Sequence, residues 1–174
     1  MYALIDLFWE ICLLRKGPQA LPPSQTLLKF SLTAYGLSSL IFLLLIQEPF
    51  LALLQTLVDV ALLVGTVYVV LTITRFGLRF VQTLTALAGT GTLLGLVALP
   101  IFIWIDQEVA SNGAAVLPRL LFLGLIIWHI SVVAHVLHHA LSSNRWIGLL
   151  YALGYYFISW TVMDFLFPLT ESSY

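Results

Sequence analysis

The sequence predicts an all-α fold: a polytopic membrane helical bundle of five transmembrane helices, preceded by a short N-terminal interfacial helix. Of the 174 residues, 61% are hydrophobic and only 9% are charged, whereas a soluble domain carries about a quarter charged residues. The hydrophobic residues also gather in five continuous runs, each close to the roughly 20 residues that a bilayer core requires. These runs lack the two-residue alternation of a barrel strand, and a helix satisfies its own backbone hydrogen bonds in lipid.

Composition excludes several classes of function. The mean hydropathy of +1.05 is too high for an ordinary soluble enzyme. Eight acidic and seven basic side chains leave the chain near neutral, so no positive field attracts nucleic acid. The single cysteine, Cys12, cannot form an intramolecular disulfide.

Residues 1–16 are predicted to form a short amphipathic helix at the membrane interface. Asp6 and Glu10 are four residues apart and share one face of a helix that is otherwise apolar. Two cations close this helix, and Gly17 and Pro18 end it. The segment lacks the basic start and the small-residue cleavage site of a signal peptide. Because its polar face is acidic, we expect it either to dock on the bundle or to bind the lipid surface.

Residues 17–26 are predicted to be a Pro-containing linker, and residues 27–169 to hold the five transmembrane helices. Clusters of turn-forming residues separate the apolar runs. The expected spans are residues 27–46, 50–74, 80–105, 117–141 and 146–167. All connections are short, so the bundle is antiparallel with almost no mass outside the membrane. Residues 170–174 are expected to form a C-terminal tail.

The third span is unusually rich in small and hydroxyl-bearing residues. They are Thr83, Thr85, Ala86, Ala88, Gly89, Thr90, Gly91, Thr92 and Gly95. Small residues let helices approach closely, so this span is predicted to lie in the centre of the bundle. We interpret the pattern as helix packing rather than as a conduction path.

Basic residues predict the orientation of the chain, because they concentrate in cytoplasmic loops. Reading the spans alternately places six of the seven on one side: Arg15, Lys16, Lys29, Arg75, Arg79 and Arg145. Only Arg119 falls on the other side. The sequence therefore predicts a multi-pass protein of the bacterial inner (plasma) membrane, with a cytoplasmic N-terminus and a periplasmic C-terminus.

Tryptophan and tyrosine residues cluster towards the ends of spans. They are Trp104, Trp146, Tyr151, Tyr155, Tyr156 and Trp160. Such side chains are enriched at membrane–water interfaces, so we expect several of them in interfacial belts.

All four histidines lie in the fourth span, within eleven residues. His135 and His139 are neighbours on one helix face, with His138 beside His135 and with His129 nearer the membrane centre. Two imidazoles spaced in this way can share a divalent metal. Axial ligation of a haem by two histidines would instead require a second helix. Structural, metal-binding and proton-linked roles are the three interpretations of this histidine face.

His135, His138 and His139 are the candidate metal ligands, but the set is incomplete from sequence alone. A stable site normally needs four ligands, and one helix supplies all the imidazoles. Cys12 or a dimer that pairs two fourth spans are the two ways to add ligands. We predict no stoichiometric metal in the purified monomer, and no cofactor.

Asp59 is the main acidic anomaly inside the membrane. It lies about eight residues into the second span, roughly 12 Å deep. An unpaired carboxylate is costly at that depth, so it should be protonated or paired. Arg119 and Asp164 lie in the outer parts of the fourth and fifth spans. The sequence therefore predicts an ion-pair cluster of Asp59, Arg119 and Asp164, which is either a structural pair or a transport or substrate site.

Motifs for catalysis are absent from the sequence. It holds no nucleophile elbow, no phosphate-binding loop, no H-E-x-x-H helix and no C-x-x-C pair. We therefore predict that the protein is not an enzyme.

The overall architecture resembles that of the Yip1-like membrane proteins, which share five spans, a cytoplasmic N-terminus, very short loops and a Pro-containing linker. The stretch CLLRKGPQALP, residues 12–22, is also similar to the N-terminus of small inner-membrane proteins of proteobacteria, some of them grouped with that family. The Asp-Leu-Tyr-Gly motif of eukaryotic members is absent, so their role in vesicle trafficking is not carried over. The resemblance implies a non-enzymatic membrane protein with no catalytic residues to transfer.

Two functions are therefore expected, in this order. The first is a non-enzymatic scaffold or partner of other membrane proteins, with the lipid bilayer, other membrane proteins or a second copy as partners and no nucleic acid. The alternative is a small transporter or proton-linked membrane factor that uses Asp59, Arg119 and the histidine face from His129 to His139.

Overall fold

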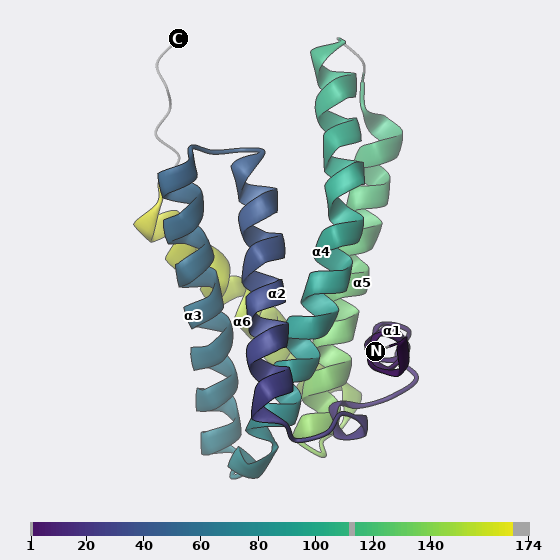
Figure 1. Ribbon diagram of the computed structural model, residues 1–174, viewed down its shortest axis with the longest axis vertical. Coiled ribbons are helices and arrows are strands. Elements are labelled where there is room, and N and C mark those ends of the chain that lie inside the picture. Colours follow the sequence, from purple (N-terminus) through teal and green to yellow (C-terminus); the bar gives the residue numbers. More distant parts are fainter. Residues whose placement is uncertain (1, 112–113, 169–174) are drawn as a thin grey trace.

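A computed structural model describes residues 2–111 and 114–168 of the chain, and these residues form helices and no strands (Figure 1). Five helices are long: α2 (Gln25–Leu44), α3 (Pro49–Ile73), α4 (Phe80–Ala110), α5 (Val116–Ala140) and α6 (Arg145–Leu166). Each is long and apolar enough to cross a membrane. The predicted all-α bundle of a multi-pass membrane protein is confirmed. The predicted tail, residues 170–174, lies outside the described residues.

The predicted span boundaries agree with these helices to within a few residues, except at the end of α4. That helix continues to Ala110, five residues beyond the predicted end at residue 105. Asp106 does not end the helix, because a charge marks where a helix leaves the lipid rather than where its hydrogen bonds stop. The Trp104 indole N–H donates to Glu108 Oε1 one turn later, at 3.3 Å, which is consistent with a helix that continues into the polar region.

Local sequence signals define several helix ends. Ser24 and Asn144 are the N-caps of α2 and α6, where their side-chain oxygens accept hydrogen bonds from backbone N–H groups at 3.3 and 2.9 Å. Pro49 occupies the first turn of α3, where its missing N–H costs nothing. Arg79, before α4, donates to the carbonyl of Ala140 at 2.8 Å, so a cation caps the C-terminal end of α5.

The N-terminal helix α1 (Tyr2–Cys12) docks on the bundle, which selects one of the two expected placements. Ile11 and Cys12 are completely buried, and the Trp128 indole N–H donates to the Cys12 carbonyl at 2.8 Å. Phe8 packs on Gly89 of α4. In Figure 1, α1 lies beside the lower half of the α4–α5 pair and is seen end-on. The helix ends four residues earlier than predicted, because the chain turns at Leu14 with a φ of 61°.

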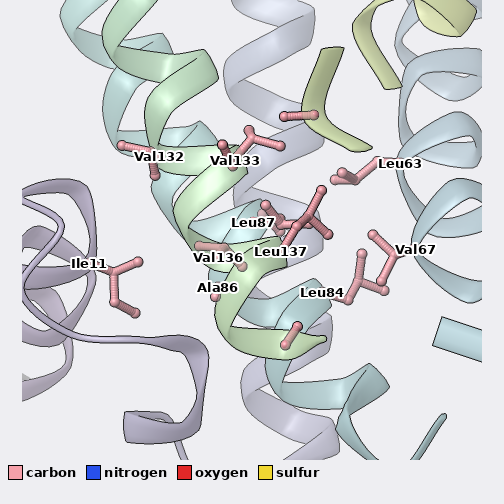
Figure 2. Packing of buried hydrophobic residues seen from close by; sticks show 14 of the residues in the cluster. Ile11, Leu63, Val67, Leu84, Ala86, Leu87, Val132, Val133, Val136 and Leu137 are labelled. Atoms are coloured by element: carbon pink, nitrogen blue, oxygen red, sulfur yellow. The ribbon is translucent and has the colours of Figure 1, made fainter. Parts of the chain in front are cut away.

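Helix α4 lies in the centre of the bundle, as its small residues predicted. All residues from Thr83 to Gly91 are buried, and α4 contacts α1, α2, α3 and α5. The hydroxyls of Thr83, Thr85 and Thr90 donate to carbonyls four residues earlier at 2.6–2.8 Å, so burial leaves these hydroxyls paired. Figure 2 shows side chains of α4, α5 and α3 meeting in this core, together with Ile11 of α1.

The short linker before α2 folds back along the end of α5. It contains a single 3₁₀ turn, η1 (Pro18–Ala20), in which Pro18 is buried. The Gln19 amide donates to the carbonyl of His139 at 2.7 Å. The linker, Arg79 and the end of α5 therefore meet at one end of the bundle.

Candidate functional site

Polar residues gather at mid-height in the bundle, because four of the five long helices each carry one or more of them near the midpoint. Asp59, for example, lies ten residues after the start of α3 and fourteen before its end, which is about 15 Å from the nearer end. The residues are Tyr35 of α2, Asp59 of α3, His129 of α5, and Tyr155 and Tyr156 of α6, while α4 contributes Gly91, which packs against the Tyr35 ring. Ionisable side chains at this depth are expensive to bury, so their convergence marks a candidate functional site.

Two adjoining cavities lie among these residues. One has a volume of about 380 Å³ and is bordered by all five long helices. The other, of about 580 Å³, lies against α6 and includes Tyr155, Tyr156 and Ser159 in its wall. Both cavities are bordered by Tyr35, Asp59 and His129. These three side chains therefore lie where the two cavities adjoin, at mid-height in the bundle.

Hydrogen bonds from α2 hold the Asp59 carboxyl group. The Tyr35 hydroxyl donates to Asp59 Oδ2 at 2.7 Å, and the Ser39 hydroxyl reaches the same oxygen at 3.4 Å. Within the described residues no hydrogen bond reaches Oδ1. One carboxyl oxygen is thus held by the protein, and the other remains available to a ligand in the cavity.

The missing side chain of Gly91 leaves room for the Tyr35 ring. A Cβ added at Gly91 would lie 2.9 Å from a ring carbon of Tyr35 and 4.0 Å from His129 Nε2. Only a glycine on α4 therefore lets the Tyr35 ring reach Asp59 and lie close to His129. The glycine-rich pattern of α4 serves the site as well as the packing.

The Tyr156 hydroxyl is buried and has no hydrogen-bond partner among the described residues. Its ring meets that of His129 edge-on, with centroids 5.9 Å apart. A buried hydroxyl without a partner costs about 1–3 kcal/mol. Such a group in the wall of a cavity is suited to bond a polar ligand.

Replacing Tyr156 by phenylalanine is therefore expected to leave the unfolding temperature in detergent unchanged or to raise it, because the unpaired hydroxyl is removed. The matched variant, Tyr35→Phe, is expected to lower stability by about 1 kcal/mol, because it removes the bond to Asp59. Thermal unfolding of the two purified variants checks this contrast. A loss of stability in Tyr156→Phe as large as that in Tyr35→Phe would contradict it.

The predicted cluster of Asp59, Arg119 and Asp164 does not form an ion pair. Within the described residues the one pair closer than 4.0 Å joins Lys16 to Glu10, at 3.3 Å. Arg119 is exposed near the start of α5, ten residues before His129, so about 15 Å of helix separates it from the level of the cavities. Asp164 is exposed as well. It follows Met163, which borders both cavities, but the turn of about 100° per residue directs it elsewhere.

Three of the histidines come together away from this site, at the end of α5 next to the linker. One ring nitrogen of each of His135, His138 and His139 lies within 4.8 Å of the others. Cys12 does not join them: it is buried under α1, and burial raises the pKa of its thiol to about 11. A thiol with that pKa is protonated at neutral pH and is a poor metal ligand.

Sequence reasoning found Asp59 and His129 but missed their partners. Tyr35 and Ser39 carry no charge, and Tyr155 and Tyr156 belong to the group of aromatic residues of which several were expected in interfacial belts. These two tyrosines are not among the interfacial ones, because they lie near the middle of α6 and border a cavity. Each lies ten or eleven residues from either end of this 22-residue helix, and that position was the available signal.

Comparisons with protein-family models, with curated proteins and with solved structures returned no match for this chain.

Proposed function

We propose that this multi-pass membrane protein is a proton-linked carrier of small organic cations, in which Asp59 binds either the proton or the cation. The observation that carries the proposal is the position of Asp59, at mid-membrane, in the wall of two adjoining cavities, with one oxygen free of protein hydrogen bonds. The proposal takes the second of the two functions expected from the sequence, without Arg119.

The energetics of a carboxylate in lipid supply the coupling. A bare carboxylate at this depth is strongly disfavoured, so the group is neutralised either by a proton or by a bound cation. The two compete for the same oxygens, and binding of one releases the other. When the site is exposed to the two sides of the membrane in turn, this competition exchanges protons for cations across it, and it needs no further ionisable group.

The cavity walls favour an organic cation over a hydrated metal ion. Aromatic side chains line the same cavity as the carboxyl group, among them Tyr35, Phe42 and Phe122. Aromatic faces attract an ammonium group, with about 2 kcal/mol when it is desolvated. Much of the remaining lining is aliphatic, as at Leu94, Leu125 and Ile126, and suits an apolar substituent.

Proton release on cation binding tests the proposal. The protein is reconstituted into liposomes that enclose a pH-sensitive dye, and tetraethylammonium or ethidium is added outside. We expect each cation to drive a proton movement that control liposomes lack. A wild-type protein that moves no protons with either cation would overturn the proposal.

A scaffold function is the second candidate, and the form of the bundle favours it. In Figure 1 the α4–α5 pair extends beyond α2 and α3 at one end, and the large side chains there are exposed, as at Trp104, Leu117 and Leu120. Purification in a mild detergent tests this candidate. A defined homo-oligomer or partner complex without cation-linked proton movement would replace the carrier by the scaffold.

We propose the bacterial inner membrane as the location, with the N-terminus in the cytoplasm and the C-terminus in the periplasm, on the strength of the basic residues. Membership of the Yip1-like family and the absence of enzymatic activity likewise remain proposals, which rest on the architecture and on the missing motifs.

Reporter fusions check the orientation. A periplasm-active reporter fused after Tyr174 is expected to give signal, and the same reporter fused near Arg75 is expected to give none. The α3–α4 connection, which holds Arg75, lies on the basic side of the bundle, and basic connections stay in the cytoplasm. The reverse pattern would invert the proposed orientation.

A further inference from the structure

We propose that His135, His138 and His139 together bind one divalent transition-metal ion of the zinc class at the end of the bundle where α5 meets the N-terminal linker. The site lies on one helix and within one chain. It differs from the prediction made from sequence, in which the helix was expected to offer too few ligands for a stoichiometric metal. It is also separate from the carrier function, because it needs neither Asp59 nor the cavities.

The three rings form a compact triangle. In helical projection His135 lies between the other two and one turn away, since residues advance by about 100° each. Ring centroids are 4.5 Å apart for His135 and His139 and 4.2 Å apart for His138 and His139. The ligand nitrogens lie within 4.8 Å of one another. Around zinc, with bonds of about 2.0 Å, they would be about 3.3 Å apart, a distance that small side-chain rotations can reach.

Backbone carbonyl groups prepare two of the rings as ligands. His135 Nε2 lies 3.2 Å from the Lys16 carbonyl, and His138 Nδ1 lies 2.8 Å from the Ser143 carbonyl. A carbonyl oxygen only accepts, so these two nitrogens are the N–H donors. In the neutral rings the opposite nitrogens then carry lone pairs. This is the arrangement of metal-binding histidines, which donate their second nitrogen to a backbone carbonyl or carboxylate and are oriented by it.

The surroundings select the class of metal. No carboxylate belongs to the triad, and Arg79 lies nearby, with its guanidinium bound to the carbonyls of His139 and Ala140. Calcium and magnesium need oxygen ligands and are disfavoured here, whereas imidazole suits zinc, copper and nickel. The three side chains are half-buried, so water reaches the fourth position. Three protein ligands and one water make an open, exchangeable site.

Elemental analysis of the chain purified without a histidine tag tests the proposal. After incubation with zinc and removal of the excess, we expect about one ion per chain. His138→Ala and His138→Gln are each expected to lower the affinity about 100-fold or more, because they remove a direct ligand rather than an outer partner. His129→Gln, which changes the one histidine outside the triad, is expected to leave the zinc content unchanged.

Cobalt gives a second readout that does not depend on any variant folding. Cobalt(II) added to the wild-type chain is expected to give the visible absorption of a four-coordinate site, and zinc is expected to remove it. Absence of both the spectrum and bound zinc would overturn the proposal. A stoichiometry of one zinc ion per two chains, with an unchanged zinc affinity in the His138 variants, would also overturn the proposal. That result would assign the ion to the His135 and His139 residues of two copies.

Discussion

Replacing Asp59 by asparagine is expected to abolish cation-driven proton movement while leaving the bundle folded. Asparagine has nearly the same shape, and its side-chain oxygen can still accept the hydrogen bond from the Tyr35 hydroxyl. It neither binds a proton near neutral pH nor balances the charge of an organic cation. The expected loss is therefore complete for transport but only about 1 kcal/mol, at most, for stability. Dye-loaded liposomes and thermal unfolding in detergent measure the two effects side by side.

The matched control for this variant is Asp164→Asn. Asp164 is also a carboxylate on a membrane-spanning helix, but it is exposed and borders neither cavity. We expect cation-driven proton movement in the Asp164→Asn variant to equal that in the wild type. If Asp59→Asn moves as many protons as the wild type and differs only in a lower unfolding temperature, Asp59 has a structural role. The carrier proposal would then lack its central group.

Replacing Gly148 by alanine is expected to lower the stability of the protein more than the same replacement at Gly154, the other glycine of α6. At this position α6 touches the backbone of α5. An added Cβ would overlap the carbonyl oxygen of Ala134 and lie 2.9 Å from the backbone nitrogen of His138. Backbone atoms cannot rotate away as side chains do, so the helices must separate. Overpacking of this kind costs about 1–3 kcal/mol, and a lower unfolding temperature in detergent measures it.

Gly154→Ala provides the comparison on the same helix. No atom lies within 4 Å of a Cβ added at Gly154, and alanine is a better helix former than glycine by up to about 1 kcal/mol. We expect this variant to be as stable as the wild type or slightly more so. Similar losses in both variants would mean that the α5–α6 contact does not depend on the small residue at position 148.

The histidine triad depends on the same contact. A Cβ at Gly148 would also lie 2.5 Å from His138 Cβ, so the close approach of α6 positions the root of the His138 side chain. We therefore expect Gly148→Ala to weaken zinc binding together with stability, whereas Gly154→Ala changes neither.

Span positions, most helix ends and the central place of α4 could be predicted from local features of the chain, whereas the ends of α1 and α4 differ by four and five residues. The membrane admits only segments that are apolar and pair their own backbone groups, so hydropathy alone locates such helices. Ser24 and Asn144 cap helices through atoms three residues away. The small residues of α4 predicted close packing, because a missing side chain lets any neighbouring helix approach, whichever helix that is.

The partners of Asp59 could not be predicted in this way. Depth along the sequence made Arg119 a reasonable partner, since charge and approximate height were the only quantities at hand. Two further quantities decide the pairing: the rotation of each helix about its axis and its tilt against its neighbours. Both result from packing over the whole bundle, and they bring Tyr35 within 2.7 Å of the carboxylate while Arg119 stays exposed.

The same division holds for the histidines. Sequence determined that His135, His138 and His139 share one face, because helical periodicity is a local property. Only the tertiary structure decided that the carbonyl of Lys16 lies beside that face, 119 residues away along the chain. The linker and the end of α5 meet because α1 docks on α4 and α5, and no local pattern encodes a contact that depends on where a separate helix is bound.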